Sequence, residues 1–357
     1  MEYLVKQEIC EKSISDFPQT RYQGSKYKLL TWIWENISFL DFEKYADLFG
    51  GTAAVSYLMK INGKSVTYND LLKSNYVTGR ALIENREARI SRFELSNVLE
   101  RENNDQLNII STIFQNIYYT NEENIWLDRI IQNINFYFDD DLHKKSILLW
   151  SLFQSCIIKR PYNLFHRKNL YIRTNNVKRN FGNKTTWDKP FEYYFKKFVH
   201  QINHAIFDNK KTCEAFQRDA LDFKNDFDLV YIDTPYVSDK GVGVDYSQFY
   251  HFLEGICDYN NWEHKIDYSK KHHPLFSQYN RWVDKNRIDS AFLDLISHYR
   301  YSHVVISYRS DGIPSVYELI KIVKKFKKNY KLVTFKNYKY VLSTNNKSDE
   351  ILIIGWD

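Results

Sequence analysis

An alternation of strand-like and helix-like segments before residue 75 is the feature that most constrains the fold of this 357-residue chain. Segments 45–49 and 65–70 carry the apolar and β-branched residues typical of strands, whereas 26–37 and 52–60 repeat apolar residues at helical spacing. Strands that alternate with helices form parallel sheets, because each helix carries the chain back across a face of the sheet. We therefore predict an α/β fold with a parallel sheet.

The rest of the chain divides into a helical block and a second block of strands. Long helical periods, as in 121–134 and 142–158, dominate residues 76–205. Strands return after residue 205, and five are predicted: 212–223, 229–232, 302–308, 331–335 and 350–356. The last two have no helix between them, which predicts a hairpin at the sheet edge. We expect residues 1–75 and 206–357 to form one domain around a helical insertion at 76–205.

Composition argues against several classes of protein. The longest apolar stretches, such as 146–153, are far shorter than the roughly 20 residues that a membrane span needs, and the amino terminus lacks the pattern of a signal peptide. We expect a cytoplasmic protein without a membrane partner, a monomer by default, with a dimer left open. The four cysteines are scattered, without a CxxC pair or a histidine at metal-ligand spacing, so we predict reduced thiols and no metal site.

The segment DLFGGTAAVS, residues 47–56, joins the first predicted strand to a helix through a glycine turn. Such a turn lets the backbone approach a ligand, and the first N–H groups of the helix face that ligand. The pattern G-x-G-x-x-G is absent and no Gly-Lys-Ser/Thr follows, which argues against a pyrophosphate or triphosphate. Asp70 ends the next strand, where an acid can bind ribose hydroxyls. Together these features favour a nucleoside-bearing cofactor without a phosphate bridge.

A second polar cluster follows segment 229–232, whose four consecutive apolar residues predict a strand covered on both faces. The strand stops at Asp233-Thr234-Pro235-Tyr236, because proline has no N–H to give to a neighbouring strand. Asp233 and the carbonyl of Thr234 could hold both N–H groups of an aromatic amine, while Tyr236 stacks on its ring. These bonds would localise the nitrogen lone pair, so positioning would supply most of the catalysis.

Five motifs together carry a resemblance to a known family. DLFGGT at 47–52, followed by DTPY at 233–236, is similar to the motif pair of amino-group DNA methyltransferases, whose usual tetrapeptide is Asp-Pro-Pro-Tyr. RYQGSK at 21–26, YYTNEEN at 118–124 and FYHFLEG at 249–255 resemble motifs of Dam-like, alpha-class N6-adenine-specific DNA methyltransferases of restriction-modification systems. The order of the motifs along the chain is also that of this class. Threonine in place of the first proline keeps the backbone carbonyl.

The resemblance implies a fold, a cofactor and a set of site residues. The fold is a Rossmann-like S-adenosylmethionine-dependent methyltransferase sheet with helices on both faces, and the helical insertion is a target-recognition domain. The cofactor is S-adenosyl-L-methionine, which leaves as S-adenosyl-L-homocysteine, and no metal is expected. Cofactor contacts are implied for Tyr22, Lys26, Asp47, Phe49, Gly50, Asp70, Asp219 and Asp233. Catalytic contacts to the target base are implied for Asp233, Thr234, Pro235 and Tyr236.

The stretch 159–189 holds nine lysines or arginines and a single acid, Asp188, interleaved with aromatic residues. Such a stretch can track phosphates and stack on bases, although a solvated basic loop has the same composition. Under the resemblance, we expect it to contact double-stranded DNA while the target adenine is flipped out, at a cost of roughly a few kcal/mol. The predicted DNA contacts are Lys159, Arg160, His166, Arg167, Lys168, Arg173, Lys178 and Arg179.

The expected function is site-specific methylation of the N6 amine of adenine in double-stranded DNA, which would protect host DNA from a cognate restriction endonuclease. Two alternatives stay open at this point. Methylation of cytosine N4 shares the geometry, although Asp233 and the motif order favour adenine. A catalytically silent DNA-binding module would keep the fold but bind little cofactor. Methylation of cytosine carbon 5 needs a cysteine nucleophile after a proline, and no cysteine here follows one.

Overall fold

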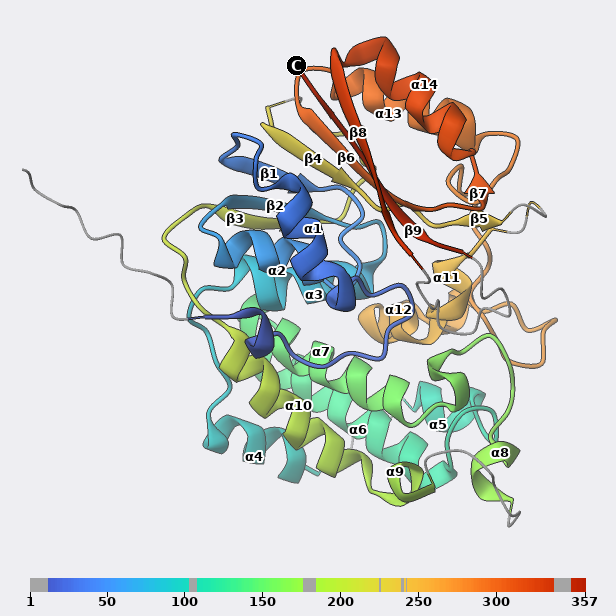
Figure 1. Ribbon diagram of the computed structural model, residues 1–357. Coiled ribbons are helices and arrows are strands. Elements are labelled where there is room, and N and C mark those ends of the chain that lie inside the picture. The colour runs from blue at the N-terminus through green and yellow to red at the C-terminus, as the bar shows by residue number, and fades with distance from the viewer. Residues whose placement is uncertain are drawn as a thin grey trace, which may run out of the picture.

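The computed structural model describes residues 12–102, 108–175, 184–224, 226–238, 241, 243–336 and 348–357 (Figure 1). A twisted sheet and its helices form one half of the molecule, and a group of helices forms the other (Figure 1). One face of the sheet packs against α1 (Leu30–Ile37), α2 (Ala54–Ile61) and α3 (Lys73–Gly79). The other face packs against α13 (Ile288–His298) and α14 (Val316–Phe326). The predicted α/β fold with helices on both faces is confirmed.

The main sheet has seven strands in the order β3-β2-β1-β4-β6-β9-β8. Their bounds are β1 Lys44–Asp47, β2 Ser65–Asn69, β3 Cys213–Phe216, β4 Leu229–Ile232, β6 His303–Arg309, β8 Asn329–Phe335 and β9 Glu350–Trp356. The strands from β3 to β6 are parallel, whereas β9 runs antiparallel between β6 and β8. The predicted terminal hairpin is confirmed, with β8 at the edge and β9 inside the sheet. A separate two-stranded ribbon pairs β5 (Val237–Ser238) with β7 (Gly312–Ile313).

The central strands are apolar on both sides because both faces of the sheet are covered. Tyr45 of β1 and Leu229 of β4 belong to the core beneath α1, α2 and α3. Their neighbours Ala46 and Val230 belong to the core beneath α13 and α14. All four residues of β4 are buried, as its unbroken apolar run predicts.

The predicted strand 212–223 was too long, because β3 ends at Phe216. Beyond it, the carboxylate of Asp219 accepts a hydrogen bond from the backbone N–H of Leu221 (2.9 Å). An aspartate that binds the backbone two residues ahead stabilises a turn rather than an extended strand. Residues 217–220 therefore leave the sheet and line a cavity at its edge.

Within its described residues, the block 76–205 contains helices joined by loops and no strand. The main helices of this block are α4 Arg92–Glu100, α5 Ile109–Ile113, α6 Asn121–Phe138, α7 Leu142–Ile158, α8 Tyr171–Thr174, α9 Lys184–Asp188 and α10 Phe191–Ala205. Ile130 of α6 and Leu148 of α7 share one apolar core with Tyr45 of β1. The block thus packs directly on the sheet half. The two predicted boundaries, at 75/76 and 205/206, and the role of this block in target recognition stay predictions.

Short helices complete the described chain. They are η1 Ile14–Asp16, η2 Tyr27–Leu29, η3 Arg80–Glu84, η4 Pro161–Asn163, α11 Tyr246–Phe249, α12 His251–Cys257, η5 Tyr259–Asn261 and η6 Glu263–Lys265. None of the helices in the described ranges combines the length and apolar character that crossing a bilayer requires.

Candidate active site

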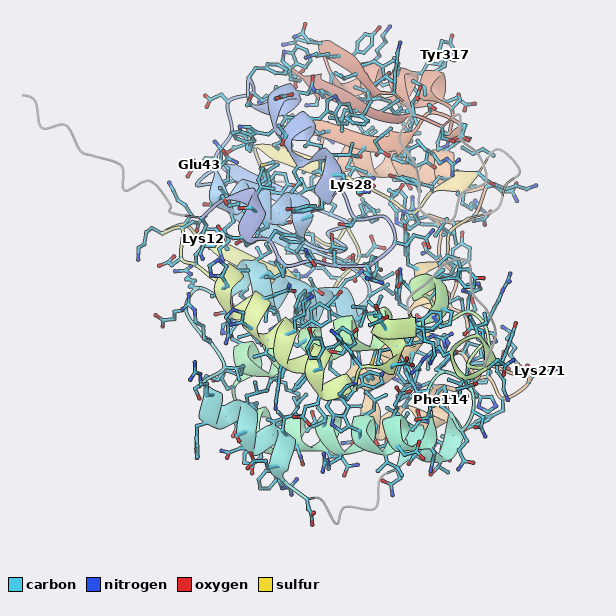
Figure 2. All side chains as sticks on the ribbon, turned by 60° about the horizontal axis from the view of Figure 1, so that its bottom comes forward. Lys12, Lys28, Glu43, Phe114, Lys271 and Tyr317 are labelled. Carbon is cyan, nitrogen blue, oxygen red and sulfur yellow. The ribbon has the colours of Figure 1, made fainter. Side chains whose placement is uncertain are left out.

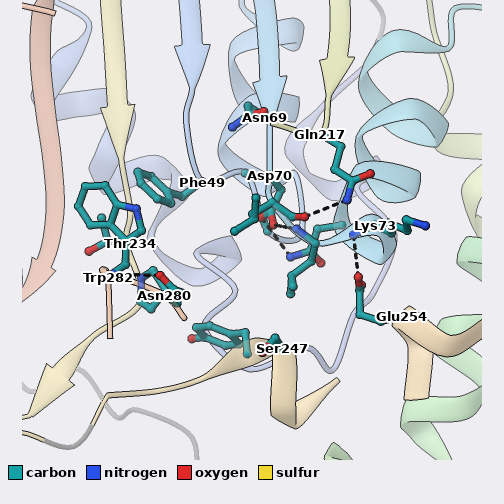
Figure 3. Close-up of a pocket in the computed structure, with 18 of the residues that line it drawn as sticks. Phe49, Asn69, Asp70, Lys73, Gln217, Thr234, Ser247, Glu254, Asn280 and Trp282 are labelled. Carbon is teal, nitrogen blue, oxygen red and sulfur yellow. Dashed lines mark hydrogen bonds between the residues drawn. The ribbon is translucent and has the colours of Figure 1, made fainter. Parts of the chain in front are cut away.

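A cavity of about 640 Å³ opens where β1, β2 and β4 end (Figure 3). These strands are parallel neighbours, so the residues that follow them meet at one edge of the sheet. The lining includes every residue predicted to contact the cofactor or the target base: Tyr22, Lys26, Asp47, Phe49, Gly50, Asp70, Asp219, Asp233, Thr234, Pro235 and Tyr236. The structure therefore gathers both predicted sets around a single cavity, and the ligand contact of each residue stays a prediction.

The glycine turn between β1 and α2 forms one wall of this cavity. A Cβ atom on Gly50 would lie only 2.1 Å from the ring of Tyr68, and Gly51 adopts a left-handed φ of +50°. The hydroxyl of Tyr68 donates a hydrogen bond to the carbonyl of Gly51 (2.8 Å). Glycine is required at both positions, because one lacks room for a side chain and the other has a backbone conformation that strains other residues.

Asp70 connects the end of β2 to the glycine turn. One carboxylate oxygen accepts hydrogen bonds from the N–H of Gly51 (2.9 Å) and the amide of Asn75 (3.1 Å), and the other accepts from the N–H of Leu72 (2.9 Å). Burial raises the pKa of Asp70 to about 6, and the two backbone hydrogen bonds oppose this rise. The carboxylate is thus held in a fixed orientation at the cavity wall, where Figure 3 labels it.

Asp47 ends β1 and has an oxygen without a partner. Its Oδ2 accepts a hydrogen bond from Ser56 Oγ (2.7 Å), whereas its Oδ1 is buried and lacks a hydrogen-bond partner among the described residues. Burial raises the pKa of Asp47 to about 7. A buried carboxylate oxygen without a partner is costly, which fits a site that is completed by a donor or a cation from a ligand.

Asp233 belongs to a buried charge network that the sequence did not reveal. Lys26 Nζ lies 3.0 Å from Asp233 Oδ1 and 3.0 Å from Glu350 Oε1, and the hydroxyl of Tyr236 contacts all three groups. Glu350, the first residue of β9, is fully buried and accepts a hydrogen bond from Ser307 Oγ (2.6 Å). Two carboxylates therefore share one ammonium group beneath the cavity.

This network sets the charge of Asp233. Burial raises the pKa of Asp233 to about 6, the nearby charge of Lys26 lowers it, and the charge of Glu350 raises it. The carboxylate is therefore mostly ionised at neutral pH. Its side chain remains 17% exposed, so it can still accept hydrogen bonds from a group in the cavity. Lys26 was predicted to contact the cofactor, and the structure adds a role in orienting Asp233.

The other residues of the tetrapeptide are buried at the cavity wall. Thr234 is 2% exposed, and its hydroxyl oxygen lacks a hydrogen-bond partner among the described residues. The ring of Tyr236 is also buried and packs edge-on against Tyr308, with 5.2 Å between ring centroids. Stacking of Tyr236 on a target base remains a prediction.

Aromatic rings that sequence reasoning did not select complete the walls. Trp282 packs edge-on against Phe49, with 4.9 Å between ring centroids, and both rings line the cavity (Figure 3). Tyr22 stacks on both Tyr246 and Tyr250, at centroid distances of 5.8 and 4.1 Å. Tyr250 lies in the motif FYHFLEG at 249–255, and Tyr246 lies three residues before that motif. No sequence signal pointed to Trp282.

Three residues that were predicted to contact DNA are buried and bonded to other residues of the protein. Lys159 and Arg173 are buried and both pair with Glu123, at 2.7 and 2.6 Å. Arg160 is buried and donates hydrogen bonds to backbone carbonyl groups. These three side chains are thus buried and bonded within the helical block, and a contact of any of them with DNA stays a prediction.

Of the other five residues predicted to contact DNA, the structure describes three. Arg167 and Lys168 are exposed, and the half-buried ring of His166 lies 5.3 Å from the ring of Phe249. These three stay predicted DNA contacts. Lys178 and Arg179 lie outside the described residues.

Comparison with known proteins identifies the class. The family described as D12 class N6 adenine-specific DNA methyltransferase matches residues 22–304 of the chain. The chain belongs to this family. The protein is therefore an adenine-specific DNA methyltransferase, which decides between the adenine and cytosine alternatives that the tetrapeptide left open. The matched range includes the glycine turn and the DTPY tetrapeptide but ends before β8 and β9.

Curated relatives of this methyltransferase share a quarter of its residues. The type II methyltransferase M2.HphI of Haemophilus parahaemolyticus is 24% identical over 342 residues, which cover 94% of this chain and 95% of the relative. The modification methylase StsI of Streptococcus sanguinis is 26% identical over 341 residues, 86% of this chain and 46% of the relative. The modification methylase LlaI of Lactococcus lactis subsp. lactis is 23% identical over 351 residues, which cover 92% of this chain and 52% of the relative. The chain thus spans about half the length of the last two.

Within the described residues of this methyltransferase, no group of three histidine, cysteine, aspartate or glutamate side chains could hold a metal ion. The described cysteines are free thiols: Cys156, Cys213 and Cys257. Cys10 lies outside the described residues.

Proposed function

We propose that this methyltransferase uses S-adenosyl-L-methionine to methylate a flipped adenine at a specific sequence of double-stranded DNA. The observation that carries the proposal is that Asp47, Asp70 and Asp233 lie at the ends of three adjacent parallel strands and line one cavity. A nucleoside cofactor and a target base need neighbouring sites, and this cavity offers acids for both. The relatives are named type II methyltransferase and modification methylase, which supports a role in protecting host DNA from a cognate restriction endonuclease.

The residues that line the cavity suit the charge and the apolar part of the cofactor. When bound, S-adenosylmethionine supplies a methyl group on a positively charged sulfur. The oxygen of Asp47 that lacks a partner would bind its cationic methionine end, and Asp70 would bind the ribose hydroxyls. Phe49 would pack against the apolar part of the cofactor, while Asp219, which is exposed at the cavity rim, would accept from the adenine amine.

We expect the affinity for S-adenosylhomocysteine to rise as the pH increases through about 7, the pKa of Asp47. Below this pH the carboxyl group is mostly neutral, and above it the anion attracts the cationic amine of the ligand. Calorimetric titration between pH 6 and 8 measures the effect. Asp47→Asn, which keeps the size and removes the charge, should bind about tenfold more weakly at pH 8 and lose most of this dependence. Equal pH profiles for the two proteins would contradict the assignment.

Asp233 and the carbonyl of Thr234 would hold the N6 amine of the flipped adenine. As N6 forms a bond to the methyl carbon, the carbon–sulfur bond breaks and N6 must release one proton. Asp233 is placed to orient an N–H of the amine and to accept that proton, because its carboxylate is ionised above about pH 6. Preorganised acceptors of this kind act mainly by positioning.

The DNA would lie across the opening of the cavity and the exposed part of the basic stretch. Arg167 and Lys168, with His166 beside them, would contact phosphates. The enzyme would act as a monomer, since a single chain supplies the residues proposed to bind the cofactor and those proposed to bind the target base.

Sequencing that detects modified bases tests this proposal. DNA from a host without methylation of its own, expressing this chain, should carry N6-methyladenine at one short sequence. The same host expressing Asp233→Ala should carry none. Unmodified DNA from the wild-type strain, or DNA with modified cytosine amines, would contradict the proposed function.

A further inference from the structure

Residues 264–281, here named the bridging segment, lie between α12 and α13 and belong to none of the motifs discussed above. Hydrogen bonds between Lys265 and Phe276 (2.9 Å) and between Asp267 and Pro274 (2.7 Å) close the backbone of its first part into a loop. Residues at both ends of the segment line the cavity, whereas His272 and His273 at the tip of the loop contact the helical block. The segment therefore connects the active site to the basic surface.

The cavity end of the bridging segment exposes two large rings. Phe276 is 61% exposed and Tyr279 is 74% exposed, and both line the cavity at its rim. The neighbouring backbone is held in place, because Leu275 accepts a hydrogen bond from the side chain of Gln248 (3.2 Å) and the next ring, Trp282, is buried. Exposed rings on a fixed backbone beside a cavity are typical of a surface that stacks on a ligand.

The tip of the loop carries an unpaired cation. Lys265 and Lys270 pair with nearby aspartates, whereas Lys271 is exposed and lacks an ion pair within the described part of the chain. Figure 2 shows Lys271 at the edge of the molecule, on the same side as Phe114 of the helical block and far from Tyr317 of α14.

The same tip lies beside the exposed part of the basic stretch. The hydroxyl oxygen of Tyr118 lies 2.7 Å from the carbonyl oxygen of His272 and 2.6 Å from that of Phe165. His273 also contacts the carbonyl of Ile113 through its ring nitrogen (3.0 Å). Lys271 is therefore held close to the segment that carries Arg167 and Lys168, and all three side chains are exposed.

We propose that the bridging segment is a second DNA-contacting element of this methyltransferase. Lys271 extends the phosphate-binding surface of Arg167 and Lys168, and the rings of Phe276 and Tyr279 stack on the bases that are exposed when the target adenine leaves the helix. One segment would thus couple backbone binding to the opening of the duplex at the cavity. The inference rests on the proposed mode of action, in which the adenine is flipped into this cavity.

The phosphate contact is tested by the salt dependence of DNA binding. Affinity for a random-sequence duplex of about 30 base pairs is measured by fluorescence anisotropy between about 50 and 200 mM salt. Lys271→Ala should reduce the slope of log affinity against log salt by about 1, whereas Lys325→Ala, an exposed lysine on α14, should leave it unchanged. An unchanged slope for Lys271→Ala would overturn this contact.

The stacking contact is tested by steady-state methylation of unmethylated plasmid DNA. Tyr279→Ala and Phe276→Ala should each lower kcat/KM for DNA by about tenfold, while Tyr279→Phe retains most of the activity because it keeps the ring. Tyr317→Ala, which removes an equally exposed ring on α14, should have no effect. Affinity for S-adenosylhomocysteine should be unchanged in all four variants. Unchanged kcat/KM in Tyr279→Ala and Phe276→Ala would overturn the inference, whereas an inactive wild-type enzyme would contradict the proposed function itself.

Discussion

Replacing Asp233 with alanine is expected to lower kcat for adenine methylation by about 10³-fold, because the amine loses its only anionic acceptor in the tetrapeptide. The fold should survive, since Lys26 keeps its partner Glu350 at 3.0 Å when Asp233 is shortened. Affinity for S-adenosylhomocysteine should change little, because the unpartnered oxygen of Asp47 and the carboxylate of Asp70 remain in place. Transfer of a labelled methyl group to DNA, together with calorimetry, measures both quantities.

Thr234→Pro is the matched control for this loss. Proline restores the usual tetrapeptide and retains the backbone carbonyl that is proposed to hold the amine, so kcat should stay within about threefold of the wild-type value. A loss comparable to that of Asp233→Ala would show that the threonine side chain takes part. Its buried hydroxyl, which lacks a partner among the described residues, is the group that such a result would implicate.

Replacing Lys26 with methionine is expected to lower the free energy of unfolding by about 3–5 kcal/mol, because two buried carboxylates would lose the charge they share. Asp233 and Glu350 each lie 3.0 Å from Lys26 Nζ, and Glu350 is fully buried. Urea denaturation measures the change. Combining Lys26→Met with Glu350→Gln removes one charge of each sign and should recover most of the lost stability. Additive losses in the double variant would contradict the shared network.

The single variant Glu350→Gln separates stability from catalysis. Asp233 must be ionised to hold the amine, so kcat/KM for DNA, which follows ionisation of the free enzyme, should fall as the pH decreases through about 6 in the wild-type protein. Glu350 raises the pKa of Asp233 through its negative charge, and its removal should therefore shift this fall to lower pH. A pH profile that does not move would show that Glu350 only packs against Lys26. The pH profile thus tests a role for Glu350, which lies outside the range 22–304 that the family comparison matches.

The site could be predicted from sequence wherever one local segment carries the information. Asp70 ends one predicted strand, the glycine turn at 50–51 follows another, and parallel strands end at the same edge. Asp233 follows an apolar run that only a strand covered on both faces explains. These arguments need no knowledge of distant contacts, and the two acids that they select, Asp70 and Asp233, line one cavity together with Asp47, which the family resemblance added.

Contacts between distant segments could not be predicted in this way. The basic composition of 159–189 gave no sign that Lys159 and Arg173 would pair with Glu123 of α6, because composition does not show which charges are compensated. The end of β3 was also missed, since the hydrogen bond of Asp219 to the backbone competes with strand pairing only once the sheet edge is defined.

The sequence by itself determined the α/β class, the glycine turn and the acids at the strand ends, because periodicity and strand termination are local properties. Only the tertiary structure decided how those acids are charged. Glu350 precedes a run of apolar residues, and the sequence around it indicates only where a strand begins. Insertion of β9 beside β6 buries it against Lys26, and burial together with this pairing sets the ionisation of Asp233.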